Sequence, residues 1–270
     1  MSIGDAEIKT QERVIRFFKD PEILGYQYIG NLSDYQNKNI KEDRLRQYLR
    51  LKGYADKLID AAVMQLQREA GNLSRGVYDA NKTVYSRLKY GIPVSESPEK
   101  PPVTVELIDE VNPLNNDFAI AEEVTVVEQS EKRPDLVVYL NGIAVAVIEL
   151  KRSSISVSEG IRQNLTNQKS LFIQSFFTTM QFCMAGNESE GLRYGTLLTG
   201  EKFYMEWKDD GFKEHEDERD PVDVRISETC VGIENKLLRQ IYAMFDKERF
   251  IDLIMNFVVF DKGFKKVCRY

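Results

Sequence analysis

The sequence contains little of the residue types on which many enzyme classes depend. Histidine occurs once, at His215, within an acidic run from Glu214 to Asp220. This scarcity argues against a serine–histidine–aspartate triad and against a histidine-rich metal site. The three cysteines, Cys183, Cys230 and Cys268, are odd in number, far apart and without zinc-site spacing. We therefore expect free thiols in a cytoplasmic protein.

Long apolar runs and targeting signals are also lacking. No stretch approaches the roughly 20 apolar residues that a membrane-spanning helix needs, so we expect no membrane partner. The first ten residues, MSIGDAEIKT, do not show the basic-then-apolar pattern of a signal peptide. The sequence contains no Gly-x-x-x-x-Gly-Lys-Ser/Thr phosphate loop and therefore predicts no ATP site within these residues.

Positive charge is scarce for a protein that would bind nucleic acid. The chain has 37 lysines and arginines against 43 acidic residues, a formal net charge of −6. Because phosphate contacts dominate DNA affinity, this balance argues against tight DNA binding by the chain alone. It is compatible with a domain that receives DNA from a neighbouring motor. A length of 270 residues with 42% hydrophobic and 30% charged content is typical of a globular protein with a sizeable core.

The stretch Arg133–Arg152, RPDLVVYLNGIAVAVIELKR, predicts a buried β-hairpin that carries charge at its open end. Two β-branched apolar runs flank an Asn-Gly dipeptide at 141–142, which is a strong hairpin signal. Asp135 precedes the first run, and Glu149 and Lys151 end the second. Burial of unpaired charge is unfavourable, so these three residues indicate a functional site.

The geometry of the turn decides whether Asp135 faces Glu149. A two-residue loop with regular pairing would place Asp135 opposite Ile148, and the two carboxylates would face away from each other. A three-residue loop over residues 140–142, with its glycine left-handed in a bulge, would pair Asp135 with Val147. That register brings both carboxylates to one face of the sheet. We predict the bulged three-residue turn.

Two carboxylates on one face of a sheet suit Mg²⁺, which prefers oxygen ligands and keeps several waters. Asp135 and Glu149 are the candidate ligands, and the backbone carbonyl of Leu150 is a candidate third. Lys151 could orient or help deprotonate a water, and could stabilise the negative charge of a phosphorane. This is the machinery of phosphodiester hydrolysis. The alternative is an incidental salt bridge at a strand end.

The same residues resemble a known motif. Pro134-Asp135 followed by Glu149-Leu150-Lys151 is similar to the PD-(D/E)xK motif of restriction-endonuclease-like nucleases. With the Asn-Gly turn between them, they resemble more closely the N-terminal nuclease region of the R subunit of type I restriction–modification enzymes. The resemblance is clearest over residues 116–207. It implies that the aspartate and the glutamate bind a catalytic Mg²⁺ and that the lysine is catalytic.

The resemblance also implies roles for polar residues on two predicted helices. Gln163, on a helix predicted over 158–169, fits the glutamine of a Gln-x-x-x-Tyr motif shared by type I and RecB-like nucleases. The tyrosine position is Asn167, which can hydrogen-bond but cannot stack. Many nucleases of this superfamily carry a helical glutamate near the metal. Glu12, on the polar side of a helix predicted over 5–19, is the candidate, and a solvated surface residue is the alternative.

Hydrophobic periodicity, taken with the resemblance, predicts an α/β fold with a central mixed sheet flanked by helices. Residues 1–102 are expected to form a mainly helical region that packs on the core, with a strand within 25–35 and helices over 40–51 and 55–69. Residues 103–207 form the predicted nuclease core, with strands over 103–108, 118–127, 178–184, 192–199 and 202–207. Residues 208–270 are predicted as an acidic loop followed by helices over 233–245 and 248–255. One of Glu122 and Glu123 is expected to approach the site from a neighbouring strand.

The resemblance further predicts what surrounds the chain. In R subunits this region leads toward an ATP-dependent motor, so the sequence is expected to hold the nuclease domain without the motor. The implied partners are double-stranded DNA and the methyltransferase (M) and specificity (S) subunits. Two other interpretations remain open. A RecB-like repair or mobile-element nuclease would cleave DNA as the chain alone or would have a different set of partners. A non-catalytic DNA-binding or scaffold domain of the same fold would bind no metal at the hairpin.

Overall fold

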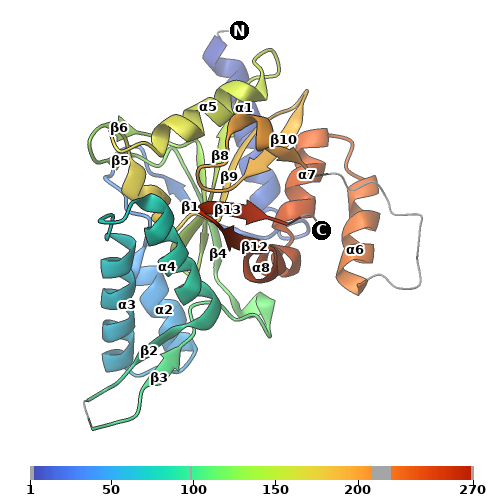
Figure 1. Cartoon of the computed structure of the whole chain (residues 1–270). Helices are drawn as coiled ribbons and strands as arrows, with labels where there is room; N and C mark the ends of the chain where they lie inside the picture. The colour runs from blue at the N-terminus through green and yellow to red at the C-terminus, as the bar shows by residue number, and fades with distance from the viewer. Residues whose placement is uncertain (1–2, 98, 208–219, 269–270) are drawn as a thin grey trace.

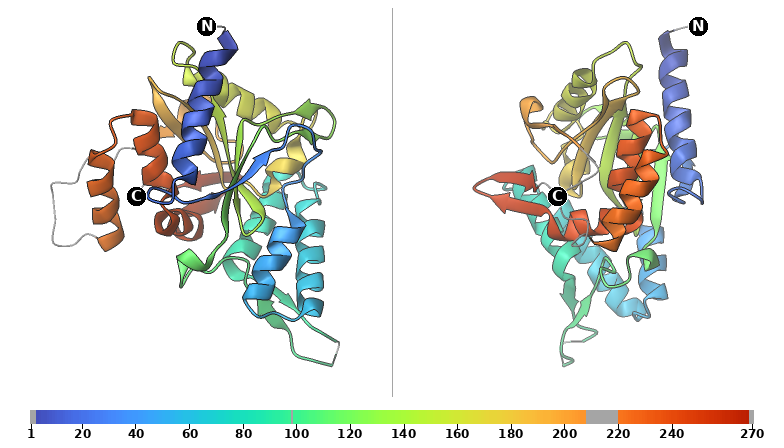
Figure 2. Two further views of the ribbon diagram at one scale, coloured as in Figure 1. Left: turned by 180° about the vertical axis from the view of Figure 1, so that it is seen from behind. Right: turned by 90° about the vertical axis from the view of Figure 1, so that its right-hand side faces the viewer.

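The computed structural model of the chain describes residues 3–97, 99–207 and 220–268, so most of the predicted acidic loop lies outside the described residues. It has an α/β fold with a central mixed sheet between two layers of helices (Figures 1 and 2), which confirms the predicted fold class. Seven strands form the sheet in the order β1 (Gln27–Asn31), β4 (Phe118–Glu122), β7 (Leu136–Leu140), β8 (Ile143–Leu150), β9 (Phe182–Asn187), β10 (Gly191–Gly195) and β11 (Met205–Glu206). The pairs β1–β4 and β8–β9 are parallel, and the other neighbours are antiparallel.

Helices cover both faces of the sheet. One face is covered by α1 (Ile3–Lys19), α7 (Lys236–Phe245) and α8 (Lys247–Asn256), with α6 (Pro221–Val231) packed outside α7. The other face carries α5 (Val157–Asn167) and the short 3-10 helix η2 (Gln174–Thr178). The helices α2 (Glu42–Leu51), α3 (Asp56–Ala70) and α4 (Val77–Tyr90) cluster beyond one end of the sheet (Figure 1). None of the helices in the described ranges is both long and apolar enough to cross a bilayer.

Alternation of side chains along the strands builds two cores, one on each face. In β4, Phe118 and Ile120 join the core under α1 and α7, whereas Ala119 and Ala121 join the core under η2. Strands β7 and β8 are buried along their whole length. Because both faces of these strands are buried, the sequence of the hairpin consists of two continuous apolar runs.

Several predicted elements differ from those in the structure. The strand predicted over 103–108 is β3 (Val103–Val105), which pairs with β2 (Ile92–Val94) in a separate two-stranded sheet and does not join the central one. The strand predicted over 118–127 is interrupted after β4, and β5 (Val126–Val127) pairs instead with β6 (Glu131–Lys132). A further hairpin, β12 (Val258–Asp261) with β13 (Phe264–Val267), follows α8. Helices α4 and α6 were not predicted.

The prediction of a three-residue turn in the central hairpin is wrong. Leu140 pairs with Ile143, so the loop contains only Asn141 and Gly142, which have positive φ angles of 51° and 80°. Such a turn matches the twist of the two strands. A Cβ on Gly142 would lie 2.6 Å from the backbone oxygen of Lys41, so both the conformation and the space require glycine here.

A bulge inside β8, not in the turn, sets the register at the open end of the hairpin. Tyr139 pairs with Ala144 and Val138 pairs with Ala146, which leaves Val145 as an extra residue. The bulge shifts the pairing beyond it by one residue, so Leu136 pairs with Ile148. One further step of this register places Asp135 opposite Glu149. The two carboxylates therefore share a face of the sheet. This shared face was predicted, although the bulge that produces it lies in β8 and not in the turn.

Candidate active site

Two carboxylates meet at the open end of the β7–β8 hairpin. Asp135 directly precedes β7, and Glu149 is the penultimate residue of β8. The backbone N–H of Leu150 donates a 2.7 Å hydrogen bond to Asp135 Oδ2, which ties the start of one strand to the end of the other. The side chain of Glu149 is fully buried. The two carboxyl groups can hydrogen-bond to each other only when one of them holds a proton.

Lys151 follows β8 and provides the ammonium group of the site. Its Nζ lies 3.8 Å from Asp135 Oδ2 and 3.1 Å from Glu7 Oε1 on α1. It also donates a 3.0 Å hydrogen bond to the backbone oxygen of Leu150. Only 13% of the lysine side chain is exposed, so its interactions with the carboxylates are poorly screened by water.

Burial and the closeness of the two carboxyl groups shift the pKa values of the site residues. Burial raises the pKa of Asp135 to about 6, against the lowering effect of Lys151. Burial, and then the charge of Asp135, raise the pKa of Glu149 well above its ordinary value. Burial lowers the pKa of Lys151, but the nearby Asp135, Glu149 and Glu7 carboxylates outweigh this effect and raise it overall. Lys151 is therefore an ammonium at neutral pH, and the buried carboxyl pair remains under-compensated.

Helix α5 fixes the orientation of Glu149. Gln163 Nε2 donates a 2.7 Å hydrogen bond to Glu149 Oε2. The helix lies very close to the sheet, because a Cβ on Gly160 would be 2.9 Å from the Cβ of Ala185 and 3.3 Å from the Cβ of Glu149. Asn167, one turn further along, is buried, and its Nδ2 has no hydrogen-bond partner within the described part of the chain.

The donor set suits a hydrated divalent cation better than a fully enclosed one. Glu149 Oε1 is buried and has no hydrogen-bond partner among the residues described. No group of three or more His, Cys, Asp or Glu side chains suited to metal binding occurs in residues 3–97, 99–207 and 220–268. The site thus offers the Asp135 and Glu149 carboxylates with the nearby Leu150 carbonyl. These oxygen donors fit Mg²⁺, which usually keeps several waters and takes only one or two carboxylates.

The glutamate that α1 brings to the site is Glu7. Glu12, the residue predicted from the sequence, is exposed, whereas Glu7 forms the ion pair with Lys151. Glu7 lies on the same side of α1 as Gln11, Val14 and Phe18. These three residues are buried against the sheet. Spacings of four, three and four residues mark one face of a helix, so this pattern could have identified Glu7.

Glu123 approaches the site from the neighbouring strand, as expected of one of the two adjacent glutamates. It follows β4 with a positive φ of 50°, and its backbone N–H donates a 2.9 Å hydrogen bond to the backbone oxygen of Asp135. Its side chain pairs with Arg133 at 2.8 Å and accepts a 3.0 Å hydrogen bond from Gln11. The charge of Glu123 contributes to the raised pKa values of Asp135 and Glu149.

Comparisons with known proteins identify the family of the chain. The family model described as type I restriction enzyme R protein N terminus matches residues 7–203. A putative type I restriction enzyme MjaIXP endonuclease subunit from Methanocaldococcus jannaschii is 26% identical over 196 residues, a match that covers 67% of this chain and 18% of that protein. The chain therefore spans less than a fifth of the length of this relative. By the extent of the family match, the chain belongs to the family of type I restriction enzyme R protein N-terminal regions.

Proposed function

We propose that the chain is the nuclease domain of a type I restriction R subunit and hydrolyses phosphodiester bonds of double-stranded DNA with Mg²⁺. The observation that carries this proposal is the meeting of two carboxylates, the fully buried Glu149 and the 16% exposed Asp135, beside one ammonium group at the end of the β7–β8 hairpin. Burial is the main cause of their raised pKa values, so a bound cation would favour the ionised carboxylates. Family membership supports the choice of reaction.

Each residue has a distinct role in this proposal. Asp135, Glu149 and the carbonyl of Leu150 would hold Mg²⁺. When bound, the cation supplies Lewis-acid polarisation of the scissile phosphate and neutralises the carboxylates. Lys151 carries an ammonium group beside the carboxylates, whose charges raise its pKa, so it would stabilise negative charge on the phosphorane and orient the attacking water. Gln163 keeps Glu149 in position through its 2.7 Å hydrogen bond.

In the complete enzyme, cleavage would follow ATP-driven DNA translocation by a motor outside this chain, with M and S subunits as partners. The name of the archaeal relative and its much greater length support this part of the proposal. The net charge of −6 fits a domain to which DNA is delivered. Recognition of a DNA sequence would then belong to another subunit.

The test is cleavage by the R protein that contains this chain, assembled with its M and S subunits. With Mg²⁺ and ATP, the wild type should linearise a plasmid that carries the recognition site. Lys151→Ala should abolish cleavage and keep ATP hydrolysis, whereas the exposed Lys169→Ala should preserve both. Cleavage by Lys151→Ala at the wild-type rate would refute the assignment. Cleavage by the isolated chain without ATP would instead favour a RecB-like nuclease.

A further inference from the structure

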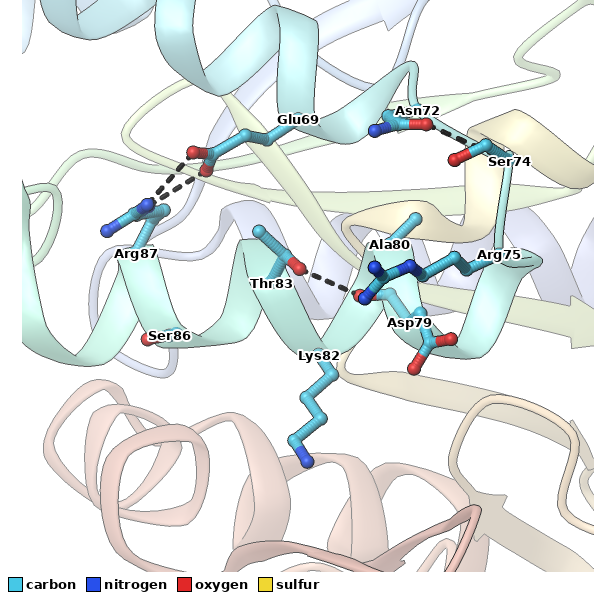
Figure 3. A pocket seen from close by; sticks show the side chains of 10 residues that line it. All are labelled: Glu69, Asn72, Ser74, Arg75, Asp79, Ala80, Lys82, Thr83, Ser86 and Arg87. Carbon is cyan, nitrogen blue, oxygen red and sulfur yellow. Dashed lines mark hydrogen bonds and ion pairs between the residues drawn. The ribbon is translucent and has the colours of Figure 1, made fainter.

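A polar pocket of about 550 Å³ lies between the end of α3 and α4, and none of its lining residues belongs to the candidate active site (Figure 3). Asn81, on the buried side of α4, hydrogen-bonds to the backbone just before β9, so α4 packs at the end of the sheet where β9 begins. The carboxylates lie at the far end of β8, whose eight residues span roughly 26 Å. No role in the proposed cleavage reaction accounts for this pocket.

The floor of the pocket is electrically neutral. Arg87 forms a two-pronged pair with Glu69, with distances of 2.8 and 2.9 Å, as Figure 3 shows. Gln65 donates a further 3.0 Å hydrogen bond to the same carboxylate. Although burial raises the pKa of Glu69, these hydrogen bonds lower it overall, so the glutamate stays ionised and compensates Arg87.

Two cations of the pocket lining have no recorded ion pair within the described residues. Arg75 and Lys82 line it, are exposed, and have no recorded ion pair or hydrogen bond to any part of the chain that the structure describes. The remaining charge in the lining belongs to Asp79, in the first turn of α4, where a carboxylate stabilises the start of a helix. The lining therefore carries a net charge of about +1 within a chain of net charge −6.

Neutral donors complete the surroundings. The hydroxyl groups of Ser74 and Ser86 line the pocket and have no recorded partner within the described ranges. Helix α4 begins after Gly76, which provides no side-chain cap for the first backbone N–H groups. The exposed cations and the hydroxyl groups together favour a phosphate-type anion over a cation or an apolar ligand.

We propose that this pocket binds a phosphate of the DNA backbone and anchors the duplex at a distance from the cleavage site. A free nucleotide would present the same phosphate chemistry. The ten lining residues include no aromatic side chain on which a base could stack, and the cations face open solvent, so a backbone phosphate is the better match. The inference relies on the proposed function only for its ligand, duplex DNA.

The test measures binding of a fluorescent duplex to this chain by anisotropy, in EDTA and at several salt concentrations. Wild type is compared with Arg75→Ala, Lys82→Ala and the double variant. The matched control is Lys57→Ala, an exposed lysine at the far end of α3. The double variant should lose about tenfold in affinity and reduce the slope of log K against log salt by about 1, as expected for one lost phosphate contact. The control should match the wild type.

A second arm distinguishes the source of the phosphate. Adenosine monophosphate is titrated into wild type and into the double variant and followed by ³¹P NMR. We expect no saturable binding to either protein. Saturable binding that the double variant loses, with unchanged duplex affinity, would overturn the DNA assignment. Duplex affinity and salt slope equal in all variants would overturn the site itself. Since EDTA removes Mg²⁺, neither result bears on cleavage at Asp135 and Glu149.

Discussion

Gln163 and Glu149 are joined by a 2.7 Å hydrogen bond from Nε2 to Oε2, and this contact links helix α5 to the end of β8. Glu149 has a second oxygen, Oε1, that finds no partner in the described part of the chain. One oxygen is thus held by the protein, and the other is available to a ligand. The carboxylate is oriented before any cation arrives, which favours binding because less conformational freedom is lost on binding.

Removal of the Gln163 amide should weaken the site without removing a proposed ligand. Gln163→Ala should lower Mn²⁺ affinity or DNA cleavage by about 10- to 100-fold, the usual effect of losing a group that orients a metal ligand. Arg162→Ala is the matched control, because Arg162 lies next to Gln163 on α5 but pairs with Glu201 and Glu159. Equal loss of affinity in both variants would show that the contact with Glu149 is not the cause.

Neutralisation of Glu149 should stabilise the metal-free fold. Its folded pKa lies well above 4.5, so the unfolded chain releases its proton first as the pH rises, and the folded state is penalised at neutral pH. Glu149→Gln keeps an acceptor for Gln163 and should raise the free energy of unfolding at pH 7 by about 1–2 kcal/mol. Urea unfolding in EDTA measures this change. The exposed Glu12→Gln serves as control and should change little.

The stability of the metal-free wild type relative to Asp135→Asn should fall between about pH 4 and pH 6. Asp135 titrates near 3.8 when unfolded and at about 6 when folded, so the unfolded state binds fewer protons across this window. The contribution is fully present below the unfolded pKa and is lost as the pH rises through the folded pKa. Urea unfolding across this range, compared with Asp135→Asn, measures the effect. Parallel curves for the two proteins would contradict the assigned pKa.

A methyl group at Gly160 should separate α5 from the sheet. The new Cβ would lie 2.9 Å from the Cβ of Ala185, and neither backbone can move freely. Gly160→Ala should lower the free energy of unfolding by about 1–3 kcal/mol, the range for overpacking, and should reduce cleavage as Gln163 moves from Glu149. Gly232→Ala is the control, because its nearest neighbour would be 3.5 Å away. A thermal unfolding temperature of Gly160→Ala equal to that of the wild type would refute this close packing of α5 on the sheet.

Lys265 is a buried amino group that holds the β12–β13 hairpin against the rest of the chain. Its Nζ donates to Asn81 Oδ1, Met180 O and Gln181 Oε1 at 2.9, 2.9 and 2.6 Å. Lys265→Met leaves buried acceptors without a donor and should lower the free energy of unfolding by about 2–5 kcal/mol. Lys266→Met, on the same strand but exposed, should cost much less. Urea unfolding measures the loss of stability in each variant, and equal losses in Lys265→Met and Lys266→Met would contradict this role of Lys265.

The same lysine should make stability depend on pH in the opposite sense from Asp135. Burial lowers the pKa of Lys265 well below 10.5, so the unfolded chain binds the extra proton. The free energy of unfolding therefore rises with pH until the unfolded lysine also loses its proton, near pH 10. The stability gap between wild type and Lys265→Met should widen from pH 7 to pH 9. A gap that narrows over this range would contradict the lowered pKa.

Much of the fold could be predicted from the sequence, and the failures have physical causes. The central hairpin, the mixed sheet and the shared face of Asp135 and Glu149 were predicted. The bulge at Val145 could not be located, because β8 is buried on both faces and its apolar run gives no alternation to set a register. Helix α4 was missed because its buried face includes the polar Asn81, which hydrogen-bonds to three backbone oxygens.

The division of the chain at residues 102 and 207 stays a prediction. Strand β1, from the N-terminal part, forms one edge of the central sheet. A glutamate of α1 near the site was predicted, but the wrong one was named. The sequence does not show which side of α1 packs on the sheet, so it could not distinguish Glu7, which faces the site, from Glu12, which faces solvent. The local sequence pattern does not show how elements distant in the sequence pack on one another.

The most direct test of the account is calorimetric titration of Mn²⁺ into this chain, with wild type compared with Asp135→Asn and Glu149→Gln. Both variants preserve the size of the side chain and remove one negative charge. The account predicts a saturable heat of binding for the wild type that either substitution abolishes. Equal binding by all three proteins would place the metal elsewhere and contradict the assignment of Asp135 and Glu149.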